Sequence, residues 1–154
     1  MKPSIKIGML AGVIGLVLNV CVSAAAGICG PAVSLVAGAL AGYFAARQEK
    51  PATKGDGARS GATAGAIAGL LITVGQIIGA VGALAYMQYS GSTLPFGTIP
   101  SQSADASLQV IYYLTGAGTG ICFGLVGTVL AALAGAGTGY LGTPDQVPPL
   151  NINP

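Results

Sequence analysis

Two amide side chains are the strongest polar groups in the apolar segments of the sequence. Asn19 and Gln76 each lie within a long run of Leu, Ile, Val, Ala and Gly. An unpaired amide in hydrocarbon costs on the order of several kcal/mol, so we expect each to bond the other or a backbone carbonyl. Both residues are therefore predicted to join helices, with the lining of a polar permeation path as the alternative. The threonines of these runs can bond the preceding helical turn; they are Thr73, Thr115, Thr119 and Thr128.

Catalysis finds little support in the remaining side chains. The sequence has no histidine, which removes the commonest general base and the usual ligand of haem and of many metals. A GxGxxG string at Gly137, Gly139 and Gly142 follows no predicted strand, so the dinucleotide-binding context is missing. We therefore assign no catalytic, cofactor-binding or metal-binding residue, and we expect a protein that is not an enzyme.

Three cysteines allow at most one disulfide within the chain. Cys29 and Cys122 are predicted to lie near the same, outer level of the membrane, where a disulfide could join them if their Cα atoms approach within about 7 Å. The alternative is two separate reduced thiols that act as small apolar residues.

Glycines recur at four-residue spacing, which aligns them as a flat stripe on one helix face and lets helix backbones approach closely. These stripes predict helix packing within one bundle, and their excess leaves open the docking of a partner subunit or a second copy. The predicted interface glycines are Gly8, Gly12, Gly38, Gly42, Gly61, Gly65, Gly69, Gly75, Gly79, Gly116, Gly120, Gly124, Gly135 and Gly139.

The composition indicates a membrane protein. The chain is 53% hydrophobic and only 6% charged, whereas soluble proteins carry about 25% charged residues. A formal net charge of +2 is too small for the basic stripe that nucleic-acid binding needs. We expect membrane lipids, and other membrane subunits or further copies, as the partners.

Four apolar segments predict an all-α, polytopic four-helix bundle in a single domain over residues 1–154. The spans are expected at about 7–26, 32–46, 61–89 and 108–141, since about 20 residues cross a bilayer. Residues 47–60 form the predicted cytoplasmic loop, 90–107 the outer loop and 142–154 the C-terminal tail. A cleaved signal peptide is the competing interpretation of the first segment.

All six basic residues fall on one side of this four-span arrangement. Lysines and arginines of short loops stay in the cytoplasm, so both termini are predicted to face the cytoplasm of a cell membrane. The six basic residues are Lys2, Lys6, Arg47, Lys50, Lys54 and Arg59. The spans themselves contain no charged residue, which disfavours a pump or a rotor subunit.

Two segments of the chain resemble two others. Residues 8–19 match residues 65–76, with Gly8 over Gly65 and Asn19 over Gln76, and residues 37–44 match residues 134–141. This pattern predicts two parallel helical-hairpin repeats, related by an axis along the membrane normal.

The strings Ala37-Gly-Ala-Leu-Ala-Gly42 and Ala64-Gly-Ala-Ile-Ala-Gly69 resemble those of small Gly/Ala-rich four-helix prokaryotic membrane proteins of unknown function. The resemblance implies a fold and no activity. Our leading expectation is a structural or accessory subunit of a larger membrane complex or a homo-oligomer. The alternative is a small channel, holin-like pore or uncoupled transporter, lined by Asn19, Gln76 and the threonines.

Overall fold

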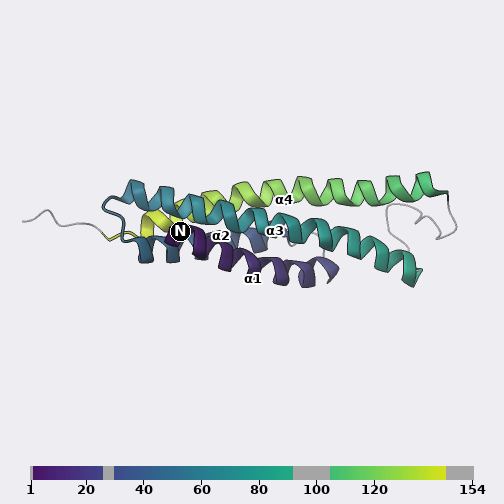
Figure 1. The fold of residues 1–154 in the computed structure, drawn as a ribbon, viewed down its shortest axis with the longest axis horizontal. Helices are drawn as coiled ribbons and strands as arrows, with labels where there is room; N and C mark the ends of the chain where they lie inside the picture. Colours follow the sequence, from purple (N-terminus) through teal and green to yellow (C-terminus); the bar gives the residue numbers. More distant parts are fainter. Residues whose placement is uncertain (1, 26–29, 92–104, 145–154) are drawn as a thin grey trace, which may run out of the picture.

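The protein is an all-α bundle of four packed helices, as the sequence predicts. The computed structural model describes residues 2–25, 30–91 and 105–144. Helix α1 covers Pro3–Ala25, α2 covers Gly30–Glu49, α3 covers Lys54–Ser90 and α4 covers Ala106–Gly142 (Figure 1). The start of α1, the end of α2, the start of α3 and the end of α4 lie together at one end of the bundle.

Helix α3 begins earlier than the sequence analysis predicts. The segment 47–60 is not a loop, because α2 continues to Glu49 and α3 starts at Lys54. The hydroxyl of Thr53 accepts a hydrogen bond from the backbone N–H of Asp56 at 3.1 Å, which caps the first turn of α3. Lys50 takes a left-handed conformation with φ of 46° before Pro51, which ends α2. The connection is therefore a short turn between two capped helices.

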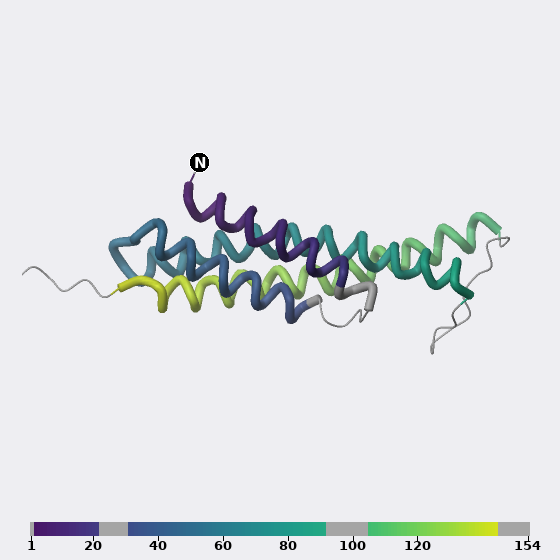
Figure 2. Tube along the Cα trace, turned by 90° about the horizontal axis from the view of Figure 1, so that it is seen from below, coloured from purple at the N-terminus to yellow at the C-terminus, as the bar shows by residue number. Residues whose placement is uncertain are grey.

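Contacts between glycines and neighbouring helices give the helix directions. Gly8 lies against Ala64 and Gly12 lies against Ala68, so α1 runs parallel to α3. Gly38 lies against Ala131 and Gly42 lies against Gly135, so α2 likewise runs parallel to α4. The two hairpins therefore point the same way and lie side by side (Figure 2).

A two-fold axis does not relate these hairpins. Such an axis would make the contact of α1 with α4 equivalent to that of α2 with α3. In the described residues α2 packs against α3, whereas α1 and α4 do not touch. The order of the helices around the bundle is α1, α2, α4, α3. A sideways shift, and not a rotation, therefore superimposes α1 on α3 and α2 on α4. The predicted axis along the membrane normal is thus wrong, although the common direction of the hairpins agrees with the prediction.

Large apolar side chains point outward and small ones fill the core. Leu10, Leu114 and Leu133 are 66%, 69% and 65% exposed, and many other large apolar residues are exposed too. The fully buried core is mostly alanine, with Ile72 as its largest apolar member. An apolar exterior of this extent is typical of a surface that contacts lipid rather than water.

Helices α3 and α4 are much longer than α1 and α2. Each has 37 residues, or about 55 Å at 1.5 Å per residue, and their far ends extend beyond the first hairpin (Figure 1). Among the described residues α1, α3 and α4 are long and apolar enough to cross a membrane. Helix α2 is not among them; its uncharged part, 30–46, is near the lower limit of about 17 residues for a span.

Candidate functional site

Helices α3 and α4 pack backbone against backbone through a line of glycines. A Cβ atom added to Gly65 would collide with the carbonyl oxygen of Ala131, and one added to Gly61 would lie 2.9 Å from the Cα of Gly139. Real Cβ atoms essentially never approach backbone atoms below 3.0 Å. Only glycine allows this separation, so the glycine line sets the distance between the two helices.

The predicted interface glycines lie at helix contacts inside the bundle. Gly8, Gly12 and Gly75 lie between α1 and α3, Gly38 and Gly42 between α2 and α4, and Gly61, Gly65, Gly69, Gly116, Gly120, Gly124, Gly135 and Gly139 between α3 and α4. Gly79 is buried on α3. By contrast, an added Cβ at Gly82, Gly118 or Gly137 would meet nothing within 4 Å. The glycine stripes are therefore occupied by the chain's own helices.

Gly57 extends the glycine line by one turn. Its added Cβ would lie 2.8 Å from the carbonyl oxygen of Gly139. The signal was present in the sequence, because Gly57 precedes Gly61 by the same four residues that separate Gly61 from Gly65. The polar composition of residues 47–60 predicts a loop there, so Gly57 lies outside the predicted spans.

The two intramembrane amides are buried but do not bond each other. Asn19 is fully buried, and its Nδ2 donates to the backbone carbonyl of Ile72 on α3 at 3.4 Å. Its Oδ1 has no hydrogen-bond partner among the described residues. Gln76 is 5% exposed, one turn beyond Ile72 on the same helix. The long bond of Asn19 makes this a weak polar link between α1 and α3.

Threonine hydroxyls provide stronger links to α4. Those of Thr73 and Thr128 lie 2.9 Å apart, and the hydroxyl of Thr73 also lies 2.9 Å from the carbonyl oxygen of Gly124. Thr138, which the sequence analysis did not select, donates to the carbonyl of Ala39 on α2 at 2.7 Å. Thr115 and Thr119 instead bond carbonyls of their own helix. The buried hydroxyls thus join helices at contacts where the backbones are already close.

Glu49 links helices, a role that the sequence pattern does not predict. Its carboxylate accepts a hydrogen bond from the backbone N–H of Ser4 at 2.9 Å and another from the hydroxyl of Ser60. One side chain at the end of α2 therefore connects the first turn of α1 to the second turn of α3. Burial acts to raise the pKa of Glu49, but the bonds from Ser60 and Ser4 and the charge of Lys2 outweigh it, so the pKa lies below 4.5.

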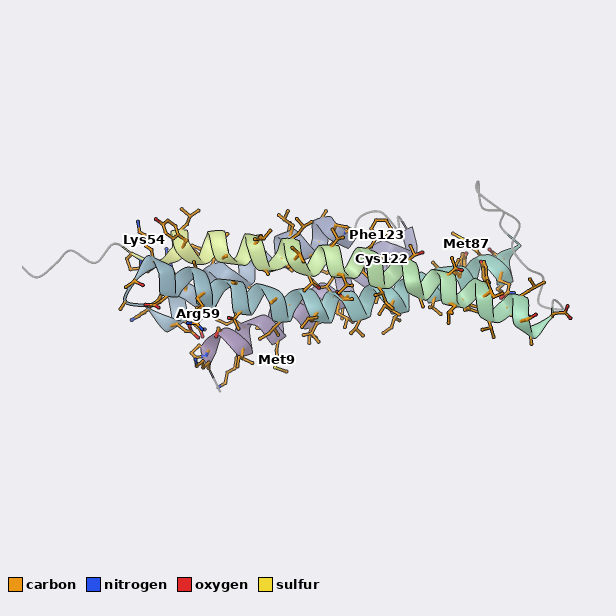
Figure 3. The ribbon with its side chains drawn as sticks, turned by 90° about the horizontal axis from the view of Figure 1, so that it is seen from above. Met9, Lys54, Arg59, Met87, Cys122 and Phe123 are labelled. Atoms are coloured by element: carbon orange, nitrogen blue, oxygen red, sulfur yellow. The ribbon has the colours of Figure 1, made fainter. Side chains whose placement is uncertain are left out.

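Aromatic rings hold two basic residues at this end. The guanidinium of Arg47 lies 5.1 Å from the ring centre of Tyr43, and the amino group of Lys54 lies 5.4 Å from that of Tyr140. Both distances fit cation–π contacts. Lys54 and Arg59 lie near this end, and Met87 lies toward the far end (Figure 3).

Cysteines and metal ligands add no further site in the described part of the chain. Cys21 and Cys122 are exposed free thiols. Cys29 lies outside the described residues, so its disulfide with Cys122 stays a prediction. Residues 2–25, 30–91 and 105–144 contain no group of three or more acidic or cysteine side chains placed to hold a metal ion.

Searches against protein-family models, curated proteins and solved structures find no match to this chain. The resemblance to small prokaryotic membrane proteins therefore stays a prediction. The function has to be inferred from the packing and the surfaces of the bundle itself.

Proposed function

We propose that the protein is a non-catalytic scaffold subunit of a cell membrane that associates with a second copy of itself. In this proposal all four helices span the bilayer, including the short α2, and both termini face the cytoplasm. The collection of the basic residues at one end of the bundle supports this orientation. The backbone contacts that fill the core support a packing role over transport.

An open groove between α1 and α2 is the observation that carries the proposal. It is apolar, has a volume of about 400 Å³, and is lined by Ala11, Ile14, Gly15, Leu18, Ala32, Val33, Val36, Ala37 and Leu40. It runs along the outer side of the first hairpin. A membrane-facing groove of this kind can accept the ridge of another helix, since packing area drives helix association in lipid.

The internal repeat indicates what such a groove accepts. Positions that are 57 residues apart, as Gly8 and Gly65 are, correspond in the two hairpins. The groove residues of α1 then correspond to Ala68, Leu71, Ile72 and Gly75 of α3. On α3 these are the positions against which α1 packs. The first hairpin thus leaves open the surface that the second hairpin uses to hold a parallel helix.

A second copy provides a parallel helix without further assumptions. Two copies inserted with their basic ends in the cytoplasm present their α1 helices in the same direction. Leu10 and Ile14 of each copy, 66% and 55% exposed, can then pack against the groove of the other. The pair would be related by a two-fold axis along the membrane normal, the commonest symmetry of homo-oligomers.

Cysteine crosslinking in native membranes tests this arrangement. In a background where Cys21, Cys29 and Cys122 are serine, Ile14→Cys or Leu18→Cys should give a dimer band of twice the chain mass after mild oxidation. Leu133→Cys is the control, because Leu133 on α4 is more exposed than Ile14 or Leu18 but does not line the groove. Equal crosslinking at all three positions, or none at the groove, would overturn the proposal.

The same variants separate the proposal from a channel. A pore lined by Asn19, Gln76 and threonines should conduct ions when the uncrosslinked protein is reconstituted in liposomes. A scaffold should give no more ion leakage than liposomes that contain no protein. Conductance by a protein that does not crosslink at Ile14 would favour the channel.

A further inference from the structure

The two sides of the basic end differ in their charge balance. Between α1 and α3, a polar pocket of about 600 Å³ contains Lys2 and Arg59 together with Glu49 and Asp56. The cations and carboxylates there are equal in number. Glu49 is directed to this side, because it bonds Ser4 and Ser60.

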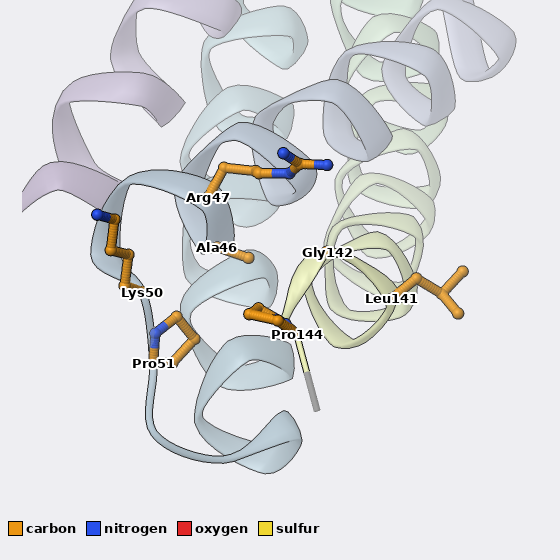
Figure 4. Close-up of a pocket in the computed structure, with 7 residues that line it drawn as sticks. All are labelled: Ala46, Arg47, Lys50, Pro51, Leu141, Gly142 and Pro144. Carbon is orange, nitrogen blue, oxygen red and sulfur yellow. The ribbon is translucent and has the colours of Figure 1, made fainter. Parts of the chain in front are cut away.

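Between α2 and α4, a second pocket has cations without carboxylates. It has a volume of about 520 Å³, and its described lining contains Arg47 and Lys50 but no acidic residue. Figure 4 shows Arg47 extending from α2 toward the end of α4, with Lys50 extending the other way. An anion placed here would meet a positive potential that no described carboxylate of the pocket offsets.

The guanidinium of Arg47 is placed to bind an oxyanion. The guanidinium carbon of Arg47 lies 5.1 Å from the centre of the Tyr43 ring, a cation–π contact, and the planar guanidinium carries several N–H donors. Paired N–H donors of this kind match the geometry of phosphate oxygens. The contact with the ring also restrains the side chain, which lowers the entropy lost on binding.

The rest of the pocket is apolar and continues onto the outer surface of the bundle. Its walls include Ala46, Pro51 and Leu141, and Leu141 is 79% exposed. Phe44, three residues before Arg47 on α2, is 54% exposed. A free phosphate ion gains nothing from these walls, whereas the glycerol and acyl chains of a lipid bury apolar area against them.

We propose that the pocket between the ends of α2 and α4 binds the phosphate headgroup of an anionic phospholipid from the cytoplasmic leaflet. Arg47 holds the phosphate, Lys50 adds to the positive potential, and the acyl chains lie along Leu141 and Phe44. The proposal rests on the orientation proposed above, because that orientation puts the pocket at the headgroup level. It does not depend on self-association.

Lipid retention by the purified protein provides the test. Protein extracted in mild detergent is mixed with phosphatidylglycerol or with phosphatidylcholine of the same chains, and bound lipid is counted by native mass spectrometry. We expect the wild type to retain phosphatidylglycerol in preference. The double variant Arg47→Gln, Lys50→Gln should weaken retention about fivefold for each charge removed.

Matched controls separate this site from a general effect of charge. The double variant Lys2→Gln, Arg59→Gln removes the same charge from the balanced side and should retain phosphatidylglycerol as the wild type does. The variant Arg47→Lys, Lys50→Arg keeps both charges and should retain most binding. Equal loss in the two glutamine variants, equal retention of phosphatidylcholine, or displacement of the lipid by millimolar inorganic phosphate would overturn the proposal.

Asp145 requires a separate control, because its carboxylate follows Pro144 of the pocket directly in the sequence. Retention that is similar in the wild type and in Asp145→Asn supports an open lipid site. Retention that appears only in Asp145→Asn would mean that the chain neutralises its own pocket, and the proposal would fail.

Discussion

Helices α1 and α4 both pack along α3, but they do so by different means. Against α4, glycines on both helices bring backbone to backbone, and hydroxyls of Thr73 and Thr128 bond within the contact. Against α1, the contacts reach side chains as well: an added Cβ at Gly15 would meet the tip of Ile72 at 2.7 Å. The polar link there is the 3.4 Å bond of Asn19. We infer that α3 and α4 form the rigid part of the bundle and that α1 is easier to displace.

Adding one methyl group to selected glycines gives the largest expected effect on this difference. Gly65→Ala should lower the free energy of unfolding by about 1–3 kcal/mol, because the new Cβ meets the backbone of Ala131 and neither helix can yield locally. Gly15→Ala should cost less, about 1 kcal/mol, since the new Cβ meets Cδ1 and Cγ1 of the Ile72 side chain rather than a backbone, and a side chain adjusts more easily than a helix. Unfolding in mixed micelles by titration with a denaturing detergent measures both.

Gly137→Ala is the control for the change in helix propensity. Nothing lies within 4 Å of an added Cβ at this position. Alanine favours a helix by about 1 kcal/mol over glycine, so this variant should be neutral or slightly stabilised. Should Gly15→Ala cost as much as Gly65→Ala, the distinction between backbone and side-chain contacts would be lost.

Removing a hydroxyl from the contact between α3 and α4 should have a smaller effect. Thr73→Val keeps the shape but loses the bonds to Gly124 and Thr128, which should cost about 0.6 kcal/mol, the average for such bonds in membrane proteins. Thr119→Val should cost close to nothing, because the Thr119 hydroxyl bonds only its own helix at Thr115. Identical melting temperatures for the two variants would show that the buried hydroxyls do not stabilise the contact.

The two contacts also show which parts of the packing can be predicted from the sequence. Glycine spacing predicts that backbones meet, because only glycine at every fourth position makes a helix face flat. It does not predict which helices meet, since Gly8 and Gly65 carry the same signal but face different neighbours. The two-fold axis failed for that reason: a repeat fixes which segments are alike, while the packing of unequal helices fixes how they are arranged.

Charged residues near helix ends were harder to interpret than the apolar spans. The segment from Arg47 to Ser60 is polar, which favoured a loop, yet Thr53 and Asp56 form a capping pair for α3. Glu49 lies in that polar segment, so the sequence alone predicts a solvated side chain. Its role depends on the fold, which brings the first turn of α1 and the second turn of α3 beside the end of α2.

Glu49 gives the smallest expected effect, and pH provides the means to isolate it. The carboxylate joins α1 to the other helices at the basic end, and its pKa is below the ordinary value of 4.5 in the folded protein. A lowered pKa means that the ionised form stabilises the fold. That stabilisation is fully present above pH 4.5 and is lost as the pH falls through the lowered pKa. The side chain is partly exposed and screened by water, so we expect about 0.5 kcal/mol or less from it.

The difference in melting temperature between the wild type and Glu49→Gln measures this contribution. It should be constant from pH 7 to pH 5 and should shrink toward zero in more acidic solution, because the wild-type carboxylate then becomes neutral as well. Asp56→Asn is the control, since the described hydrogen bonds of the Asp56 carboxylate and backbone N–H are to Thr53 at the start of α3 and none of them is to α1. Hydrogen exchange locates the effect: protection should fall in the first turns of α1 and remain in the contact between α3 and α4. Equal loss of protection in both places would show that α1 is held as firmly as α4.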